Sequence, residues 1–165
     1  MTKSESARWK GIGLAALLVC AMLATTAAAQ VAPTKIMRLC FANAGSYYKI
    51  PPTLLTAIAK TESHFDARSH HHNRGGSIDV GLMQINSRWF PKLHQRGIER
   101  RALMDPCTSI WVAAWILSDN IDRFGYTWKA IGAYNAGGAD AAVQRRQLYI
   151  SRVAMNMTSS DTGMR

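Results

Sequence analysis

Hydrophobic residues recur at helical spacing along most of the chain. Leu54, Leu55 and Ile58 fall on one helical face, because residues three, four and seven positions apart stack together on a helix. A second run at this spacing lies between residues 105 and 124 and comprises Ile110, Ala113, Ala114, Leu117 and Ile121. The pattern predicts a mainly α-helical domain whose central core helix is the second run.

Start and stop signals place the first two helices. We expect one helix over residues 31–46, with Ile36, Leu39 and Cys40 on one apolar face that Ala44 continues. Pro51 and Pro52 then open a second helix that runs to about Ser63, since proline is well accommodated in the first turn.

The later helices follow the same rules. Asp105 caps the central helix, and Phe124 lies near its end. Thr127 is expected to cap a short helix from Trp128 to Tyr134, and a last helix runs through Leu148, Ile150 and Val153. Residues 156–165 contain few apolar groups and are predicted to be disordered.

The stretch 64–86 does not have a helical pattern. Residues 66–79 are polar and turn-rich, and 80–86 is a compact, mostly apolar run, so we expect two or three short strands here. His70, His71 and His72 are adjacent and cannot all point at one ion, so they predict a solvated loop tip and no metal site.

The segment after these strands is expected to hold a short helix or turn over 87–92, followed by a loop over 93–104. Trp89 and Phe90 are candidates to line a sugar site, because aromatic faces stack on pyranose rings. The alternative is that one or both only cap the core.

Glu62 interrupts the apolar face of the second helix. A carboxyl group on a buried face is costly to ionise, which raises its pKa toward the value that a general acid needs near neutral pH. The competing interpretation is a helix-end glutamate turned to water. The turn-rich segment that follows favours a cleft edge, with Gly81, Gln84 and Asn86 able to approach a ligand or bind it through amides.

The N-terminal 29 residues have the layout of a secretory signal peptide: a basic start, an apolar run over 12–23 and the small residues Ala27–Ala29. The alternative is an uncleaved membrane anchor, for which the apolar run is short. We therefore expect cleavage after Ala29, export to the periplasm and a domain over 30–155.

Charge and cysteine content limit the possible partners. Cleavage would leave a net charge of about +8, with the basic residues scattered rather than clustered, which favours anionic peptidoglycan or phospholipid over nucleic acid. Cys40 and Cys107 would remain, and an even number in an exported chain suggests one disulfide. Two buried free thiols are the alternative.

Three motifs in order resemble the lytic transglycosylases that have a goose-type-lysozyme-like fold. They are TES ending at Ser63, GLMQIN from Gly81 to Asn86, and AYNAG from Ala133 to Gly137. The stretch from Ile78 to Phe90 is also similar to chicken-type lysozymes. The resemblance covers roughly residues 36–153 and implies a lysozyme-like domain.

The resemblance also implies a chemistry. Glu62 would cleave the β-1,4 bond between N-acetylmuramic acid and N-acetylglucosamine, first as acid and then as base, forming a 1,6-anhydro ring without a cofactor. Substrate-binding roles would fall to Ser63, Gly81, Met83, Gln84, Asn86, Tyr134 and Asn135. Without the resemblance, Tyr134 reads equally as a core aromatic with its hydroxyl satisfied.

Two alternatives stay open. Asp79 directly precedes the second motif and could serve as the second carboxylate of a hydrolytic lysozyme. A non-catalytic glycan-binding scaffold of the cell envelope belongs to another class. We expect a monomer that acts on glycan strands. Small enzymes of the family that the chain resembles serve secretion, conjugation or pilus systems, so proteins of such an apparatus are expected as further partners.

Overall fold

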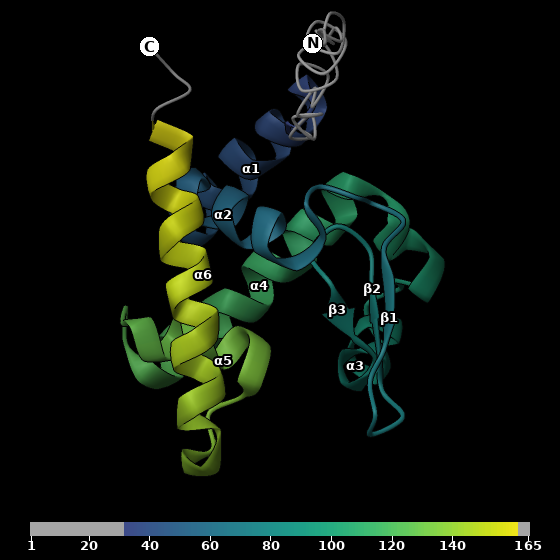
Figure 1. Ribbon diagram of the computed structural model, residues 1–165. Coiled ribbons are helices and arrows are strands. Elements are labelled where there is room, and N and C mark those ends of the chain that lie inside the picture. Colours follow the sequence, from purple (N-terminus) through teal and green to yellow (C-terminus); the bar gives the residue numbers. More distant parts are fainter. Residues whose placement is uncertain (1–31, 162–165) are drawn as a thin grey trace, which may run out of the picture. The chain divides into compact units, whose positions relative to one another are not determined.

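The computed structural model describes residues 32–161, which belong to one compact unit. The predicted signal peptide, residues 1–29, lies outside the described residues, as does the end of the predicted tail, 162–165. The described chain is mainly helical with one small sheet, so the predicted fold class is confirmed (Figure 1).

Five longer helices make up most of the unit. They are α1 (Lys35–Tyr48), α2 (Pro52–Ser63), α4 (Pro106–Phe124), α5 (Trp128–Ala136) and α6 (Val143–Asp161). Short helical segments connect them: η1 (Ser87–Trp89), α3 (Phe90–His94), η2 (Arg100–Met104) and η3 (Asp140–Ala142). The segment 87–104, expected to hold a short helix or turn and a loop, thus contains three helical pieces.

Side-chain caps explain where the helices begin. The side chains of Thr34, Asp105 and Thr127 accept hydrogen bonds from backbone amides in the first turns of α1, α4 and α5. These bonds satisfy amides that have no partner within the helix. Lys49 and His64 end α1 and α2 in the left-handed conformation.

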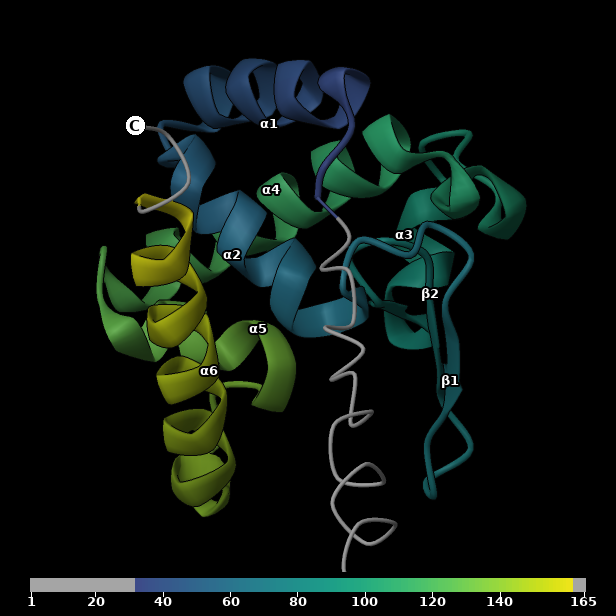
Figure 2. The ribbon, with the colours of Figure 1, turned by 45° about the horizontal axis from the view of Figure 1, so that its top comes forward.

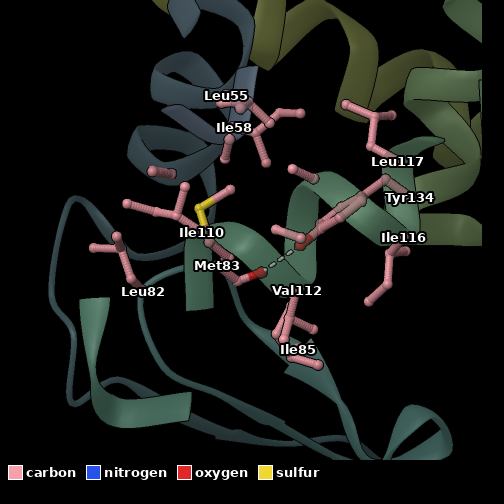
Figure 3. Packing of buried hydrophobic residues seen from close by; sticks show 14 of the residues in the cluster. Leu55, Ile58, Leu82, Met83, Ile85, Ile110, Val112, Ile116, Leu117 and Tyr134 are labelled. Atoms are coloured by element: carbon pink, nitrogen blue, oxygen red, sulfur yellow. Dashed lines mark hydrogen bonds between the residues drawn. The ribbon is translucent and has the colours of Figure 1, made fainter. Parts of the chain in front are cut away.

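Helix α4 is the centre of the packing. It contacts α1 and α5 along its length, and α6 packs against both α2 and α5 (Figures 1 and 2). The buried cluster includes Leu55 and Ile58 from α2, Leu82 and Met83 from the turn after the sheet's second strand, and Ile110 from α4 (Figure 3). The helices and the sheet therefore share one core.

The buried face of α1 differs from the one predicted. On the predicted face Ala44 is buried and Cys40 is partly buried, but Ile36 and Leu39 are 66% and 56% exposed, and Met37 and Phe41 are buried in their place. Both faces of this helix carry apolar residues at helical spacing, so periodicity alone could not choose between them. The face that packs against α2 and α4 is the one with Phe41 at its centre.

A disulfide joins Cys40 in α1 to Cys107 in the first turn of α4, as predicted. Their Cα atoms are 5.4 Å apart, and the bond spans 67 residues of sequence. Closing a loop of this size stabilises the folded state by about 4 kcal/mol on the chain-entropy model.

The sheet is antiparallel with strand order β1-β2-β3: β1 (His70–His72), β2 (Ile78–Val80) and β3 (Ile85–Asn86). The register places His70 opposite Val80, and Asp79 opposite Asn86. The three histidines therefore form an exposed strand and not the predicted loop tip. Two of the apolar side chains between 80 and 86 anchor the sheet, since Val80 and Ile85 are buried.

Two helices run further than predicted. α5 continues to Ala136, and α6 continues to Asp161, six residues into the segment expected to be disordered. The extension of α6 has a tertiary contact, because the Asn156 side chain donates to Thr61 Oγ1 of α2 at 2.9 Å. None of the helices within residues 32–161 combines the length and apolar character needed to span a bilayer.

Candidate active site

A cavity of about 360 Å³ opens where the end of α2, the sheet, and the ends of α5 and α6 meet. Polar side chains dominate its lining: Glu62, Asn73, Ser77, Asp79, Gln84, Asn86, Arg88, Tyr134, Asn135 and Arg145. Ile85, Trp89, Ile116 and Ala136 complete it. A polar hollow with a small apolar part suits a ligand rich in hydroxyl and amide groups.

Glu62 lies in the last turn of α2 and reaches the cavity. The sequence places it there because Leu55 and Ile58, on the same helical face, are fully buried and pull that face inward. Burial raises the pKa of its carboxyl from about 4.5 to about 7, and the negative charge of Asp79 adds to this rise. Tyr149 and Arg152 act in the opposite direction, with smaller effect.

Tyr149 of α6 interacts with the Glu62 carboxyl and influences its pKa. It is 4% exposed, and its hydroxyl lowers the pKa of Glu62 by favouring the charged form. Within the described residues this hydroxyl makes no hydrogen bond of good geometry. The interaction between Tyr149 and Glu62 is therefore not a fixed hydrogen bond. Burial and the Glu62 charge raise the pKa of Tyr149 well above 10, so the phenol stays protonated.

Tyr134, at the end of α5, also borders the cavity. Its hydroxyl donates to the Met83 carbonyl at 2.9 Å, which ties α5 to the turn after β2 (Figure 3). The Met83 amide donates to Ser109 Oγ of α4 at 3.1 Å. The two backbone groups of Met83 are thus engaged inside the protein, and its side chain is fully buried.

Ser63 and Gly81, both predicted to bind substrate, make close contacts inside the protein. Ser63 Oγ donates to the Leu82 carbonyl at 2.7 Å and so joins α2 to the turn. Gly81 has φ +80°, and a Cβ there would lie 2.0 Å from the Leu103 carbonyl oxygen. Glycine is required here because the backbone passes close to η2.

A network of amides fixes the sheet side of the cavity. Asn73 donates to one oxygen of Asp79 at 2.8 Å, and Asn86 donates to the other at 2.7 Å. Asn86 also caps η1 by accepting from the Arg88 amide. Gln84 has φ +48°, and its side-chain nitrogen donates to the carbonyls of Ser69 and Gly81. These two bonds do not use its side-chain oxygen, which can accept a hydrogen bond.

The cavity brings together seven of the residues singled out from the sequence: Glu62, Asp79, Gln84, Asn86, Trp89, Tyr134 and Asn135. Ser63, Gly81 and Met83 lie behind its wall. Trp89 borders the cavity, but Phe90 packs against the core instead.

Several residues of the site were not foreseen from the sequence. Asn73, Ser77, Arg88 and Arg145 line the cavity, and Tyr149 lies beside Glu62. Loop asparagines and surface arginines have no periodicity that marks them. For Tyr149 the available signal is its position four residues before Val153, which places both side chains on one face of the last helix. No group of three or more His, Cys, Asp or Glu side chains within residues 32–161 is arranged to hold a metal ion.

Comparison with known proteins shows the family to which the chain belongs. Residues 39–152 match the transglycosylase SLT domain, which is more than half of the chain. Invasion protein IagB of Salmonella typhimurium (strain SL1344) is 43% identical over 118 residues, covering 71% of this chain and 74% of IagB.

Two further relatives show similar coverage. Protein IpgF of Shigella flexneri is 39% identical over 111 residues, 67% of this chain and 73% of IpgF. A peptidoglycan-binding-like protein of Escherichia coli O157:H7 is 39% identical over 122 residues, 69% of this chain and 73% of its own. The chain therefore belongs to the transglycosylase SLT domain family and is, by that membership, a peptidoglycan lytic transglycosylase.

Proposed function

We propose that the cavity binds a peptidoglycan glycan strand and that Glu62 cleaves the β-1,4 bond between N-acetylmuramic acid and N-acetylglucosamine. The observation that carries this proposal is a carboxyl in a polar cavity whose pKa is raised to about 7. Such a group is substantially protonated at neutral pH and can donate its proton, which an ordinary surface glutamate cannot.

The reaction then needs one carboxyl in two roles. Glu62 gives its proton to the glycosidic oxygen, and the bond from C1 of the muramic acid to that oxygen breaks, with its electron pair going to the oxygen. The N-acetyl oxygen of the same sugar stabilises the cationic C1. The C6 hydroxyl oxygen then bonds to C1, and its proton returns to Glu62. No water is consumed, and the product ends in a 1,6-anhydro ring.

The surrounding tyrosines suit this sequence of protonation states. Burial keeps Tyr134 and Tyr149 protonated, so neither competes with Glu62 as an acid at neutral pH. The Tyr149 hydroxyl can donate to the carboxylate while it is charged, because it has no other hydrogen bond of good geometry among the described residues. The environment thereby stabilises the intermediate state in which Glu62 waits to act as base.

The bonds of Asp79 favour a structural role over a catalytic one. Both of its oxygens accept hydrogen bonds from asparagine side chains, which connect the β1–β2 turn to β3. A carboxylate held in this way supports the sheet, and its charge contributes to the raised pKa of Glu62.

The test is the product and its dependence on Asp79. We expect muropeptides released by the wild type to be lighter by one water than hydrolysis products, as read by mass spectrometry. Asp79→Asn should keep much of this activity if circular dichroism shows that the fold survives. Reducing ends formed from the outset, together with loss of most activity in a folded Asp79→Asn variant, would instead identify a hydrolase.

The biological setting is proposed from the relatives. One of them is named an invasion protein, so we propose that this chain opens the wall locally for a secretion, conjugation or pilus system. Such a role requires export to the periplasm, in agreement with the predicted signal peptide. Fractionation of cells that express the full chain should place a product cleaved after Ala29 in the periplasm.

A further inference from the structure

Two arginines line the cavity from separate walls, and we propose that Arg88 and Arg145 bind the carboxylates of the peptide stems on the glycan strand. This inference rests on the proposed function, because it names the part of peptidoglycan that the site recognises besides sugar. Arg88 belongs to η1 beside the sheet, and Arg145 belongs to the first turn of α6.

The backbone beneath Arg88 is fixed. Its amide donates to Asn86 Oδ1 at 3.1 Å, and Asn86 is itself held by Asp79. Next to it, the ring of Trp89 packs edge-to-face on Trp115 at 5.5 Å between centroids. The guanidinium therefore extends from a rigid support toward the cavity, while the side chain itself remains exposed.

The support beneath Arg145 is equally firm. The neighbouring Arg146 is buried, and its guanidinium donates to the carbonyls of Gly137 and Ala139. These bonds fix the loop that follows Tyr134 and Asn135 against the start of α6. Arg146 is thus a structural arginine, whereas Arg145 is exposed and faces the cavity.

Within residues 32–161, no acidic side chain forms an ion pair with either cavity arginine. Among the described residues, ion pairs join His94 to Glu99 and Arg123 to Asp119, and neither Arg88 nor Arg145 takes part in one. The Asp79 carboxylate in the same cavity already accepts from two asparagines. The two guanidinium groups, which come from η1 and α6 and have no ion-pair partner in the described chain, can therefore bind an anionic ligand in the cavity.

The ligand chemistry follows from the substrate. The sugar backbone of peptidoglycan is neutral, but its peptide stems carry free carboxylates attached through the muramic acid. A guanidinium binds a carboxylate through two parallel hydrogen bonds, each stronger than a neutral one. The two arginines would therefore favour strands that bear stems, and they would place the muramic acid near Glu62.

The experiment measures binding, so that it does not depend on turnover. In a Glu62→Gln background, the affinity for soluble peptidoglycan fragments is compared with that for the same fragments after their stem carboxyls have been amidated. We expect Arg88→Gln and Arg145→Gln each to weaken binding of the native fragments about tenfold, since each variant loses a charge-assisted hydrogen bond to a carboxylate. Binding of the amidated fragments should change less than twofold.

Arg100→Gln is the matched control, because it removes the same charge from an exposed residue that does not line this cavity. It should leave both affinities unchanged. Equal affinity of the Glu62→Gln protein, with both arginines intact, for native and amidated fragments would overturn the inference. So would a loss of affinity in the two arginine variants that is equal for native and amidated fragments. Absence of anhydro products from the wild type would count against the proposed function alone.

Discussion

Glu62 keeps a proton near neutral pH because burial outweighs the hydroxyl of Tyr149 and the charge of Arg152, which favour its ionised form. At the residue scale this one balance controls the chemistry. The burial of Glu62 also lowers the stability of the folded protein, since a buried acid is less favourable than a neutral side chain of the same shape. Two measurable consequences follow from the direction of the pKa shift.

The first consequence concerns the rate. The free enzyme must hold the proton on Glu62 to begin the reaction, so kcat/KM should fall about tenfold per pH unit above a pKa of about 7. Initial rates on soluble glycan strands between pH 5 and 9 measure this profile. A flat profile up to pH 9 would show that Glu62 is not the acid.

The second consequence concerns stability. In the unfolded chain Glu62 loses its proton near pH 4.5, but in the folded protein it does so near 7, so folding stability falls as pH rises between these values and stays lower above them. Glu62→Gln lacks this penalty. We expect it to be more stable than the wild type at pH 8, by up to about 3 kcal/mol, and equal near pH 4.5. Urea unfolding at the two pH values measures both; a difference that does not depend on pH would contradict the assignment.

At the element scale, single contacts connect segments that are far apart in sequence. Tyr134 joins α5 to the turn after β2, Ser63 joins α2 to the same turn, and Met83 joins that turn to α4. The turn 81–84 is thus the meeting point of three helices, and Glu62 is positioned through it. Changes at this turn should affect both folding and activity.

Tyr134→Phe tests this connection. The substitution removes only the hydroxyl and leaves the Met83 carbonyl without its donor in a buried site, which costs about 1–3 kcal/mol. Urea unfolding measures the loss. Tyr126→Phe is the control, because Tyr126 is 58% exposed and should lose little. Equal stability of the two variants would show that the bond to Met83 contributes nothing.

The disulfide is the covalent connection between elements. Replacing Cys40 and Cys107 together by serine should lower the free energy of unfolding by about 2–5 kcal/mol, because the unfolded chain regains the freedom of a 67-residue loop. Non-reducing urea unfolding measures the change, and the wild type treated with a reductant should approach the double variant. If reductant leaves the wild-type midpoint unchanged, the bond is absent or does not stabilise.

At the scale of the whole molecule, the sequence predicted what depends on local pattern. The central helix, its Asp105 cap and the position of Glu62 on the face of Leu55 and Ile58 follow from periodicity and capping. The exposed side of α1 was predicted wrongly, since both of its faces are apolar. Only the packing against its neighbours decides which face is inside.

The rest of the site depends on tertiary structure. Tyr149 and Arg145 come from α6, which is far from α2 in sequence and packs against α2 and α5 in the fold. Polar residues in loops, such as Asn73, carry no local mark of their place in the cavity. The contact of Gly81 with η2 and the bond from Ser63 to the turn after β2 likewise depend on the fold and have no local signal.

The most direct test of the central claim compares wild type and Glu62→Gln on purified peptidoglycan, with the released muropeptides identified by mass spectrometry. Since a positioned acid supplies about 100- to 10,000-fold and Glu62 acts twice, the folded variant should release anhydro products at least about 100-fold more slowly. Wild-type products should end in anhydro rings. Comparable release by a folded Glu62→Gln protein would contradict the account.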